Sequence, residues 1–318
     1  MDSIFGFVRV SRLLTVCLSV LLMAAGGRQA TAQPAVPVVR IVAAENFYGD
    51  IARQIAGPAA QVDSILDNPD QDPHLFEVSP STARRLSLTD VVIYNGLGYD
   101  PWMEKMLRVG AGRSSGPLQR QQIVVAGLMP HQPQDNPHLW YDIGHVRALA
   151  RAVAGALQQR QPQETGAIDA RLQAFERALD ALSLTIAEMR QRYQGTPVTA
   201  TEPVFGYMAD ALGLTMRHLG YQRAIMNESE PAPGDVVALE KDLRGKNVAV
   251  LFFNTQASGR AALRAQKIAA ASGVPLVGIS ETMPPGSHYQ EWMARQLSQL
   301  AVQLGPSAKG ASAKVPMP

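Results

Sequence analysis

The chain has 318 residues, of which 46% are apolar and 18% charged, enough apolar material for two domains or one large one. Its formal net charge is +2. The first 32 residues carry three arginines and one aspartate, so the remainder has 26 basic and 26 acidic residues and is formally neutral. This balance implies no basic surface for nucleic acid or a membrane, and we expect no nucleic-acid partner.

The first 32 residues have the pattern of an export signal. Arg9 and Arg12 precede the apolar run Leu13–Ala25, and a small-x-small cleavage site ends at Ala32. The run is too short for a comfortable transmembrane span. A buried N-terminal helix is the alternative, but the order of charge, apolar run and cleavage site favours a signal peptide over residues 1–32. We therefore expect a periplasmic protein.

The only cysteine, Cys17, lies inside this apolar run. A lipid-anchored protein usually has a small residue just before the modified cysteine at the end of the run, whereas Val16 precedes Cys17 and the run continues past it. We therefore expect a soluble product after cleavage. The mature chain would contain no cysteine, which excludes a disulfide framework, a thiolate metal site and a cysteine nucleophile.

Strands and helices alternate through the first half of the mature chain, which is typical of parallel βαβ units. Loops are expected at Gly110–Gly116 and Leu128–Pro137. This pattern predicts an N-terminal metal-binding lobe over residues 33–162. The expected strands are Val38–Ala44, Val62–Leu66, Asp90–Tyr94 and Ile123–Ala126, and the expected helices are Phe47–Ala56, Ser79–Leu86 and His145–Gln159.

The stretch Asp169–Tyr193 has the longest helical pattern. An ordinary core helix or a coiled-coil seam would show the same spacing. At 1.5 Å per residue the stretch spans roughly 37 Å, enough to brace two lobes, and we predict a linking helix over residues 163–194. Its apolar residues recur at alternating spacings of three and four: Leu172, Phe175, Leu179, Leu182, Ile186, Met189 and Tyr193.

Past this helix the alternation resumes and predicts a C-terminal lobe over residues 195–304. Residues 305–318, rich in Gly, Ala, Ser and Pro, are predicted to be a disordered tail. The predicted fold class is α/β: two lobes, each with a mostly parallel sheet flanked by helices, joined by one long rigid helix. The expected strands are Val198–Ala200, Asn247–Phe253 and Pro275–Ile279, and the expected helices are Val204–Leu212, Gly234–Leu243, Arg260–Ser272 and Ser287–Leu304.

Two histidines directly follow a proline in matching loop segments. His74 lies in Asp72–Phe76 and His138 in Asn136–Trp140. Proline fixes its own φ and restricts the residue before it, so each imidazole is held by a stiff backbone, which favours metal ligation. A single loop histidine is more often a solvated surface residue, and the matching contexts count against that alternative. His131 is a weaker candidate for an auxiliary metal-scavenging residue.

Two glutamates follow strands in the second half, Glu202 and Glu281. Taken singly, Glu202 suits a helix N-terminus and Glu281 an exposed loop. Ligands of open α/β sheets bind beyond the carboxyl ends of the strands, and all the candidate residues lie there. Two imidazoles and two carboxylates make a candidate site for a first-row divalent metal. Glu45 and Asn46, at the end of the first strand, are reserve ligands or supports for the ligands.

These motifs resemble those of the zinc- and manganese-binding solute-binding proteins of bacterial ABC importers, cluster A-I type, over nearly the whole mature chain. Asp72–Pro80 and Asn136–Trp140 are similar to the family's two histidine ligand motifs. Glu202 stands where members carry His or Glu, and Glu281 where they usually carry Asp. The resemblance implies two α/β lobes joined by a long rigid helix, with four metal ligands: His74, His138, Glu202 and Glu281.

The resemblance further implies an exported binding protein, not an enzyme, that captures a metal ion between its lobes and delivers it to a membrane ABC permease. Two imidazoles suit zinc, whereas two carboxylates make manganese or iron(II) tolerable, so Zn²⁺ is favoured and Mn²⁺ comes next. The histidine-rich loop frequent in zinc members is reduced here to Leu128–Asn136, with one histidine. We expect a monomer whose long helix limits hinge closure.

The sequence leaves two other functions open. An exported zinc-dependent hydrolase would need an open coordination position and a general base, for which Glu281 is a candidate, although no His-Glu-x-x-His motif occurs. A binding protein for an organic solute would bind its ligand equally well in the presence of a chelator.

Overall fold

A computed structural model describes residues 38–68, 76–109, 119–132 and 135–305. The predicted signal peptide, His74, the loop Gly110–Gly116 and the predicted tail beyond Gly305 lie outside these residues. Among the described helices none is long and apolar enough to cross a membrane.

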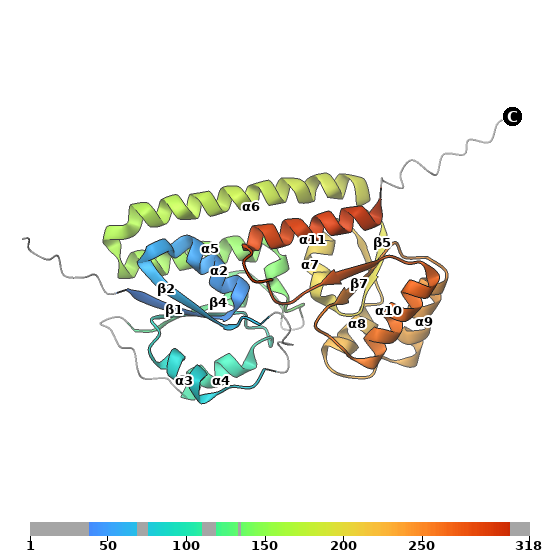
Figure 1. Cartoon of the computed structure of the whole chain (residues 1–318), viewed down its shortest axis with the longest axis horizontal. Coiled ribbons are helices and arrows are strands. Elements are labelled where there is room, and N and C mark those ends of the chain that lie inside the picture. Colours follow the sequence, from blue (N-terminus) through green and yellow to red (C-terminus); the bar gives the residue numbers. More distant parts are fainter. Residues whose placement is uncertain (1–37, 69–75, 110–118, 133–134, 306–318) are drawn as a thin grey trace, which may run out of the picture. The chain divides into compact units, whose positions relative to one another are not determined.

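Two four-stranded sheets, each entirely parallel, form the framework of the described chain (Figure 1). In each sheet the strand that comes first in the chain lies between the second and the third. The chain therefore adds strands first on one side of it and then on the other. Ligands of such sheets bind at the point where this direction changes. The predicted α/β class is confirmed. The first sheet has the order β2-β1-β3-β4, with β1 (Val39–Glu45), β2 (Ala60–Leu66), β3 (Val91–Tyr94) and β4 (Gln121–Val124). The second has the order β6-β5-β7-β8, with β5 (Pro197–Ala200), β6 (Thr215–Arg217), β7 (Leu251–Asn254) and β8 (Leu276–Ile279).

Helices follow nearly every strand, as the alternation predicts. Three elements have no counterpart in the sequence prediction: β6 is only three residues long, and α4 and α8 have eight or nine residues, too few for a clear period. Strand β7 begins at Leu251, later than predicted. The helices are α2 (Asn46–Ala56), α3 (Pro80–Ser87), α4 (Pro101–Val109), α5 (Ile143–Arg160), α6 (Thr165–Tyr193), α7 (Gly206–Ala211), α8 (Leu219–Met226), α9 (Pro233–Arg244), α10 (Arg260–Ser272) and α11 (Tyr289–Leu304).

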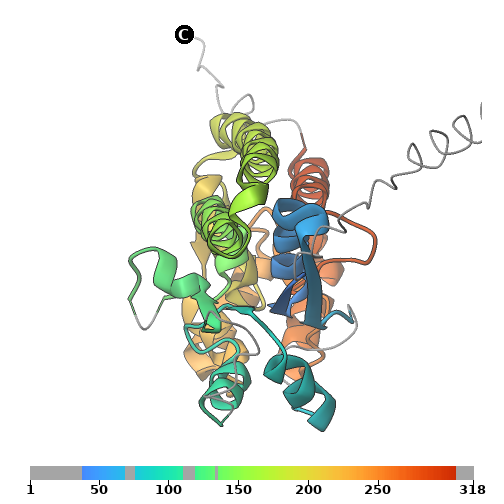
Figure 2. The ribbon, with the colours of Figure 1, turned by 90° about the vertical axis from the view of Figure 1, so that its left-hand side faces the viewer.

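The 29-residue helix α6 packs against helices from both halves of the chain, namely α2, α5, α7 and α11. Helices α6 and α11, yellow-green and red, are seen nearly end-on in Figure 2. Six of the seven predicted stripe residues of α6 are buried, and Leu172 is partly buried against the same core. One hydrophobic cluster includes Ile41 of the first sheet and Phe252 of the second. The apolar core is therefore continuous between the two sheets.

One face of α2 carries three polar residues at spacings of four, Asn46, Asp50 and Gln54, which we call the α2 polar face. Asn46 donates from Nδ2 to the Met283 carbonyl at 2.7 Å and accepts from the Met283 N–H at 3.0 Å. Gln54 exchanges two side-chain hydrogen bonds with Gln290.

Asp50, in the middle of the α2 polar face, is buried and binds the start of α11. Its Oδ2 accepts from the Tyr289 N–H at 2.9 Å, and its Oδ1 lies 2.9 Å from His288 Nδ1. The α2 polar face thus fastens the segment 280–290, which leads from β8 into α11, to a helix that follows the first strand.

The hydrogen bond to Asp50 and the charge of that carboxylate raise the pKa of His288. A raised histidine pKa adds stability that is fully present below the unfolded-state value of about 6.5 and is lost as pH rises through the folded-state pKa. We expect the free energy of unfolding in urea to fall by less than about 1 kcal/mol from pH 6 to pH 8 through this pair, because the His288 side chain is 60% exposed.

His288→Asn, which keeps a residue suited to a helix N-cap, should remove this part of the pH dependence. His131→Asn, at an exposed position, should leave it intact. If the free energy of unfolding falls equally with pH in the native protein and in His288→Asn, the pair of His288 and Asp50 is not the source of the pH dependence.

Candidate metal centre

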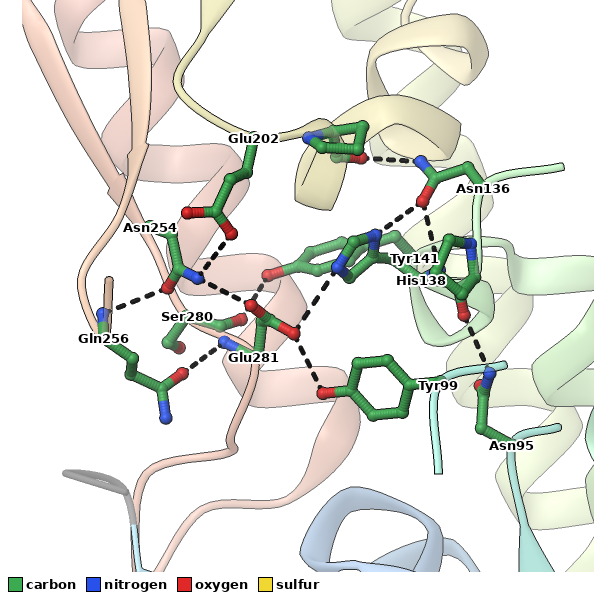
Figure 3. Close-up of polar contacts among 12 residues, drawn as sticks. Asn95, Tyr99, Asn136, His138, Tyr141, Glu202, Asn254, Gln256, Ser280 and Glu281 are labelled. Atoms are coloured by element: carbon green, nitrogen blue, oxygen red, sulfur yellow. Dashed lines mark hydrogen bonds and ion pairs between the residues drawn. The ribbon is translucent and has the colours of Figure 1, made fainter. Parts of the chain in front are cut away.

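Three polar side chains lie at one edge of the second sheet, beyond the carboxyl ends of neighbouring strands. Glu202 is two residues past β5, Asn254 ends β7, and Glu281 is two residues past β8. All three are at most 5% exposed. Because β7 lies between β5 and β8, Asn254 is placed between the two glutamates (Figure 3).

His138 comes from the other half of the chain, directly before the short 3₁₀ helix Leu139–Tyr141, and is fully buried. Its Nδ1 lies 2.5 Å from Asn136 Oδ1, while Asn136 Nδ2 donates to the Pro203 carbonyl at 2.6 Å and so fixes which way the amide faces. Since an amide oxygen only accepts, Nδ1 carries a hydrogen, so Nε2 is the ring nitrogen that can offer a lone pair to a metal ion. Asn95 donates to the Pro137 carbonyl and holds this loop in place.

His138 Nε2 faces the Glu281 carboxylate, with 3.4 Å between Nε2 and Oε2, and neither side chain is exposed. Among the described residues Nε2 has no hydrogen-bond partner. An imidazole lone pair and a carboxylate oxygen repel each other unless a proton or a cation lies near both, and a buried polar atom without a partner is costly. The pair is therefore suited to a cation.

Glu281 is held on both sides by neutral donors. Tyr99 O–H donates to Oε2 at 2.9 Å, and Asn254 Nδ2 donates to Oε1 at 2.6 Å. Burial first, and then the charge of Glu281, raises the pKa of Tyr99 well above its ordinary value, so the phenol remains a donor. Asn254 Nδ2 also donates to Glu202 Oε2 at 3.0 Å.

Three of the four predicted ligands lie within the described residues, at one site. His138 and Glu281 are in contact, and Glu202 reaches Glu281 through Asn254. Glu202 forms no side-chain capping hydrogen bond with the 3₁₀ helix Pro203–Phe205 that it precedes. His74 lies outside the described residues. Within the described part of the chain, no three His, Cys, Asp or Glu side chains are grouped closely enough to hold a metal ion.

The two reserve residues lie on the side of the first sheet. Asn46 bonds to Met283 and so supports the segment that carries Glu281. Glu45 is buried close to the acid Asp100, and neither of its carboxylate oxygens forms a hydrogen bond of good geometry with the described residues. Burial first, and then the charge of Asp100, raises the pKa of Glu45 well above its ordinary value, and burial raises that of Asp100 to about 6.

Sequence reasoning did not single out two of the residues that hold Glu281, Asn254 and Tyr99. Asn254 directly follows the predicted strand Asn247–Phe253, so the strand-end argument that gave Glu202 and Glu281 also applies to it. Tyr99 follows a turn after β3, and no periodicity marks it. The remaining histidines have other surroundings: His145 lies beside Asp142, His218 beside Asp242 and Thr199, and His131 is exposed.

Comparisons with known proteins agree on one family. Residues 41–302 match the family model described as "Zinc-uptake complex component A periplasmic". The chain is 25% identical over 262 residues to a metal ABC transporter substrate-binding lipoprotein, SloC, of Streptococcus mutans serotype c, covering 79% of this chain and 83% of the relative. It is 22% identical over 315 residues to a manganese ABC transporter substrate-binding lipoprotein, PsaA, of Streptococcus anginosus, covering 92% of this chain and 98% of the relative.

A solved structure has the same fold. The periplasmic zinc-binding protein TroA of Treponema pallidum superimposes with a TM-score of 0.71 at 20% identity, covering 85% of this chain and 100% of TroA. The family match confirms the predicted resemblance, and with it the expectations of export and of a binding protein in place of an enzyme. Because the family model matches most of the sequence, the chain belongs to the family of the periplasmic component A of zinc-uptake complexes.

Proposed function

We propose that this chain is an exported solute-binding protein that captures one divalent transition metal ion and delivers it to a membrane ABC permease. Its proposed ligands are His74, His138, Glu202 and Glu281. The observation that carries the proposal is the buried Nε2 of His138, which has no hydrogen-bond partner among the described residues and lies 3.4 Å from Glu281 Oε2. A positive ion bound by both atoms satisfies the lone pair and the carboxylate together.

The proposed cargo is Zn²⁺, with Mn²⁺ next. Two imidazoles and two carboxylates form a mixed nitrogen and oxygen site, for which zinc has the higher intrinsic affinity. The relatives named above include a zinc-binding protein and a manganese transporter component. The comparisons give no support to a hydrolase or to an organic solute. We further propose that the mature chain is a soluble monomer, with lobes at residues 33–162 and 195–304 and a linking helix at 163–194.

Removal of one ligand tests this proposal. Metal-free protein titrated with Zn²⁺ should bind one equivalent. At a free Zn²⁺ concentration a thousandfold above Kd, binding should raise the free energy of unfolding by roughly 4 kcal/mol and so raise the melting temperature. His138→Ala should weaken binding by at least about 100-fold, because loss of a hydrogen-bonded support alone costs roughly 10- to 100-fold.

His131→Ala removes an exposed histidine and is the control; in calorimetry it should retain the native affinity. Glu45→Gln tests the reserve carboxylate while keeping its shape, and it should also retain the native affinity, because Glu45 is not among the four proposed ligands. Native affinity in His138→Ala, or no metal in protein purified without added metal and none after titration, would contradict the proposed function.

Polar contacts join the two halves of the chain around the proposed site. Asn136 bonds to Pro203, and the Tyr99 hydroxyl bonds to Glu281. The Tyr289 hydroxyl donates to the Trp140 carbonyl at 2.6 Å. With the continuous core and α6, these bonds oppose a wide hinge motion, so metal binding would bring only small shifts of the lobes.

X-ray scattering measures this consequence. Profiles of the metal-free and the zinc-loaded protein should superimpose within error. A clear decrease in the radius of gyration on addition of Zn²⁺ would show the wide closure that these contacts oppose.

A further inference from the structure

Asn254 is the residue through which the two glutamates of the proposed site meet. It is 4% exposed and ends the strand that lies between β5 and β8. Its backbone N–H donates to Thr201 Oγ1 at 3.3 Å, so the position of the residue is tied to the strand end that carries Glu202.

The orientation of the Asn254 amide is set by its own oxygen. Oδ1 accepts from the Gln256 N–H at 3.0 Å, which leaves Nδ2 on the side of the glutamates. Gln256 in turn accepts the Glu281 N–H at 2.7 Å with its side-chain Oε1, so the backbone beneath Glu281 is fixed by the same turn (Figure 3). An amide NH₂ has two hydrogens, and here each has a carboxylate oxygen within reach.

The two hydrogens of Nδ2 make the oxygens of each carboxylate unequal. One hydrogen goes to Glu281 Oε1 at 2.6 Å and the other to Glu202 Oε2 at 3.0 Å. The second oxygen of Glu281, Oε2, is the one that lies 3.4 Å from His138 Nε2. Turning either carboxylate so that both oxygens face the same way would break its hydrogen bond to Nδ2, and in Glu281 it would also break the bond that Oε2 accepts from the Tyr99 hydroxyl.

We propose that Asn254 is a positioning and specificity-determining residue that makes Glu202 and Glu281 bind the metal through one oxygen each. This inference rests on the proposed function. A carboxylate that binds through one oxygen (monodentate) keeps the coordination number of the metal low. Zinc prefers four ligands in a tetrahedron, whereas sites with more carboxylate oxygens suit manganese. Asn254 therefore favours Zn²⁺ over Mn²⁺ at a site whose two carboxylates would otherwise tolerate both.

Asn254→Ala tests the inference through metal selectivity and through a spectrum. Kd values for Zn²⁺ and Mn²⁺ should change unequally, with the preference for zinc falling by about tenfold, comparable to the loss of one support of a ligand. The visible absorption of the Co²⁺-loaded protein should weaken, because four-coordinate Co²⁺ absorbs more strongly than five- or six-coordinate Co²⁺. Asn254→Ser, which restores one hydrogen-bond donor, should lie between the native protein and Asn254→Ala in both measurements.

Asn247→Ala is the matched control, because it removes an asparagine amide at an exposed position of the same lobe. It should leave both Kd values and the Co²⁺ spectrum unchanged.

Equally weakened binding of Zn²⁺ and Mn²⁺ in Asn254→Ala, with an unchanged Co²⁺ spectrum, would reduce Asn254 to a structural role and overturn the inference. If Asn254→Ala does not fold, a native spectrum and a native selectivity in Asn254→Ser would overturn it. Failure of the unmodified protein to bind Zn²⁺, Mn²⁺ or Co²⁺ would instead overturn the proposed function.

Discussion

The attachment of segment 280–290 to the α2 polar face is the constraint on which the site depends. Glu281 follows a strand of the second sheet, whereas His138 belongs to the half of the chain that builds the first. Asn46 and Asp50 bind the segment that follows Glu281, so one of the second sheet's carboxylates is held against the first half at several points. A cation bound between His138 and Glu281 would join groups that are already positioned relative to each other.

The burial of the site explains why so many neutral donors surround it. A carboxylate withdrawn from water needs hydrogen bonds or an opposite charge, and Tyr99 and Asn254 supply hydrogen bonds without adding charge. Glu45 has no such neutral donors among the described side chains, and burial first, then the charge of Asp100, raises its pKa well above the ordinary value. The proposed ligand Glu281 therefore differs from Glu45 in the neutral hydrogen-bond donors that surround it.

Much of the fold is readable from sequence because it depends on local pattern. The apolar stripe of α6 requires only a period of 3.6 residues, and buried strands such as β1 and β3 appear as short, nearly continuous apolar runs. The strand-end rule placed Glu202 and Glu281 at one sheet edge without any knowledge of their contacts. Tyr99, and Asp50 and Gln54 of the α2 polar face, could not be found in this way, because their partners are more than 180 residues distant in the chain. Such long-range polar pairs leave no periodic trace.

The continuous core also determines when the chain can finish folding. Trp292 and Leu300 of α11, the last described helix, share a hydrophobic cluster with Phe47 of α2, the first. The core is therefore incomplete until the final helix is available, and contacts between such distant residues form slowly. In an exported protein, completion of this shared core is therefore delayed until the C-terminal helix has followed the rest of the chain.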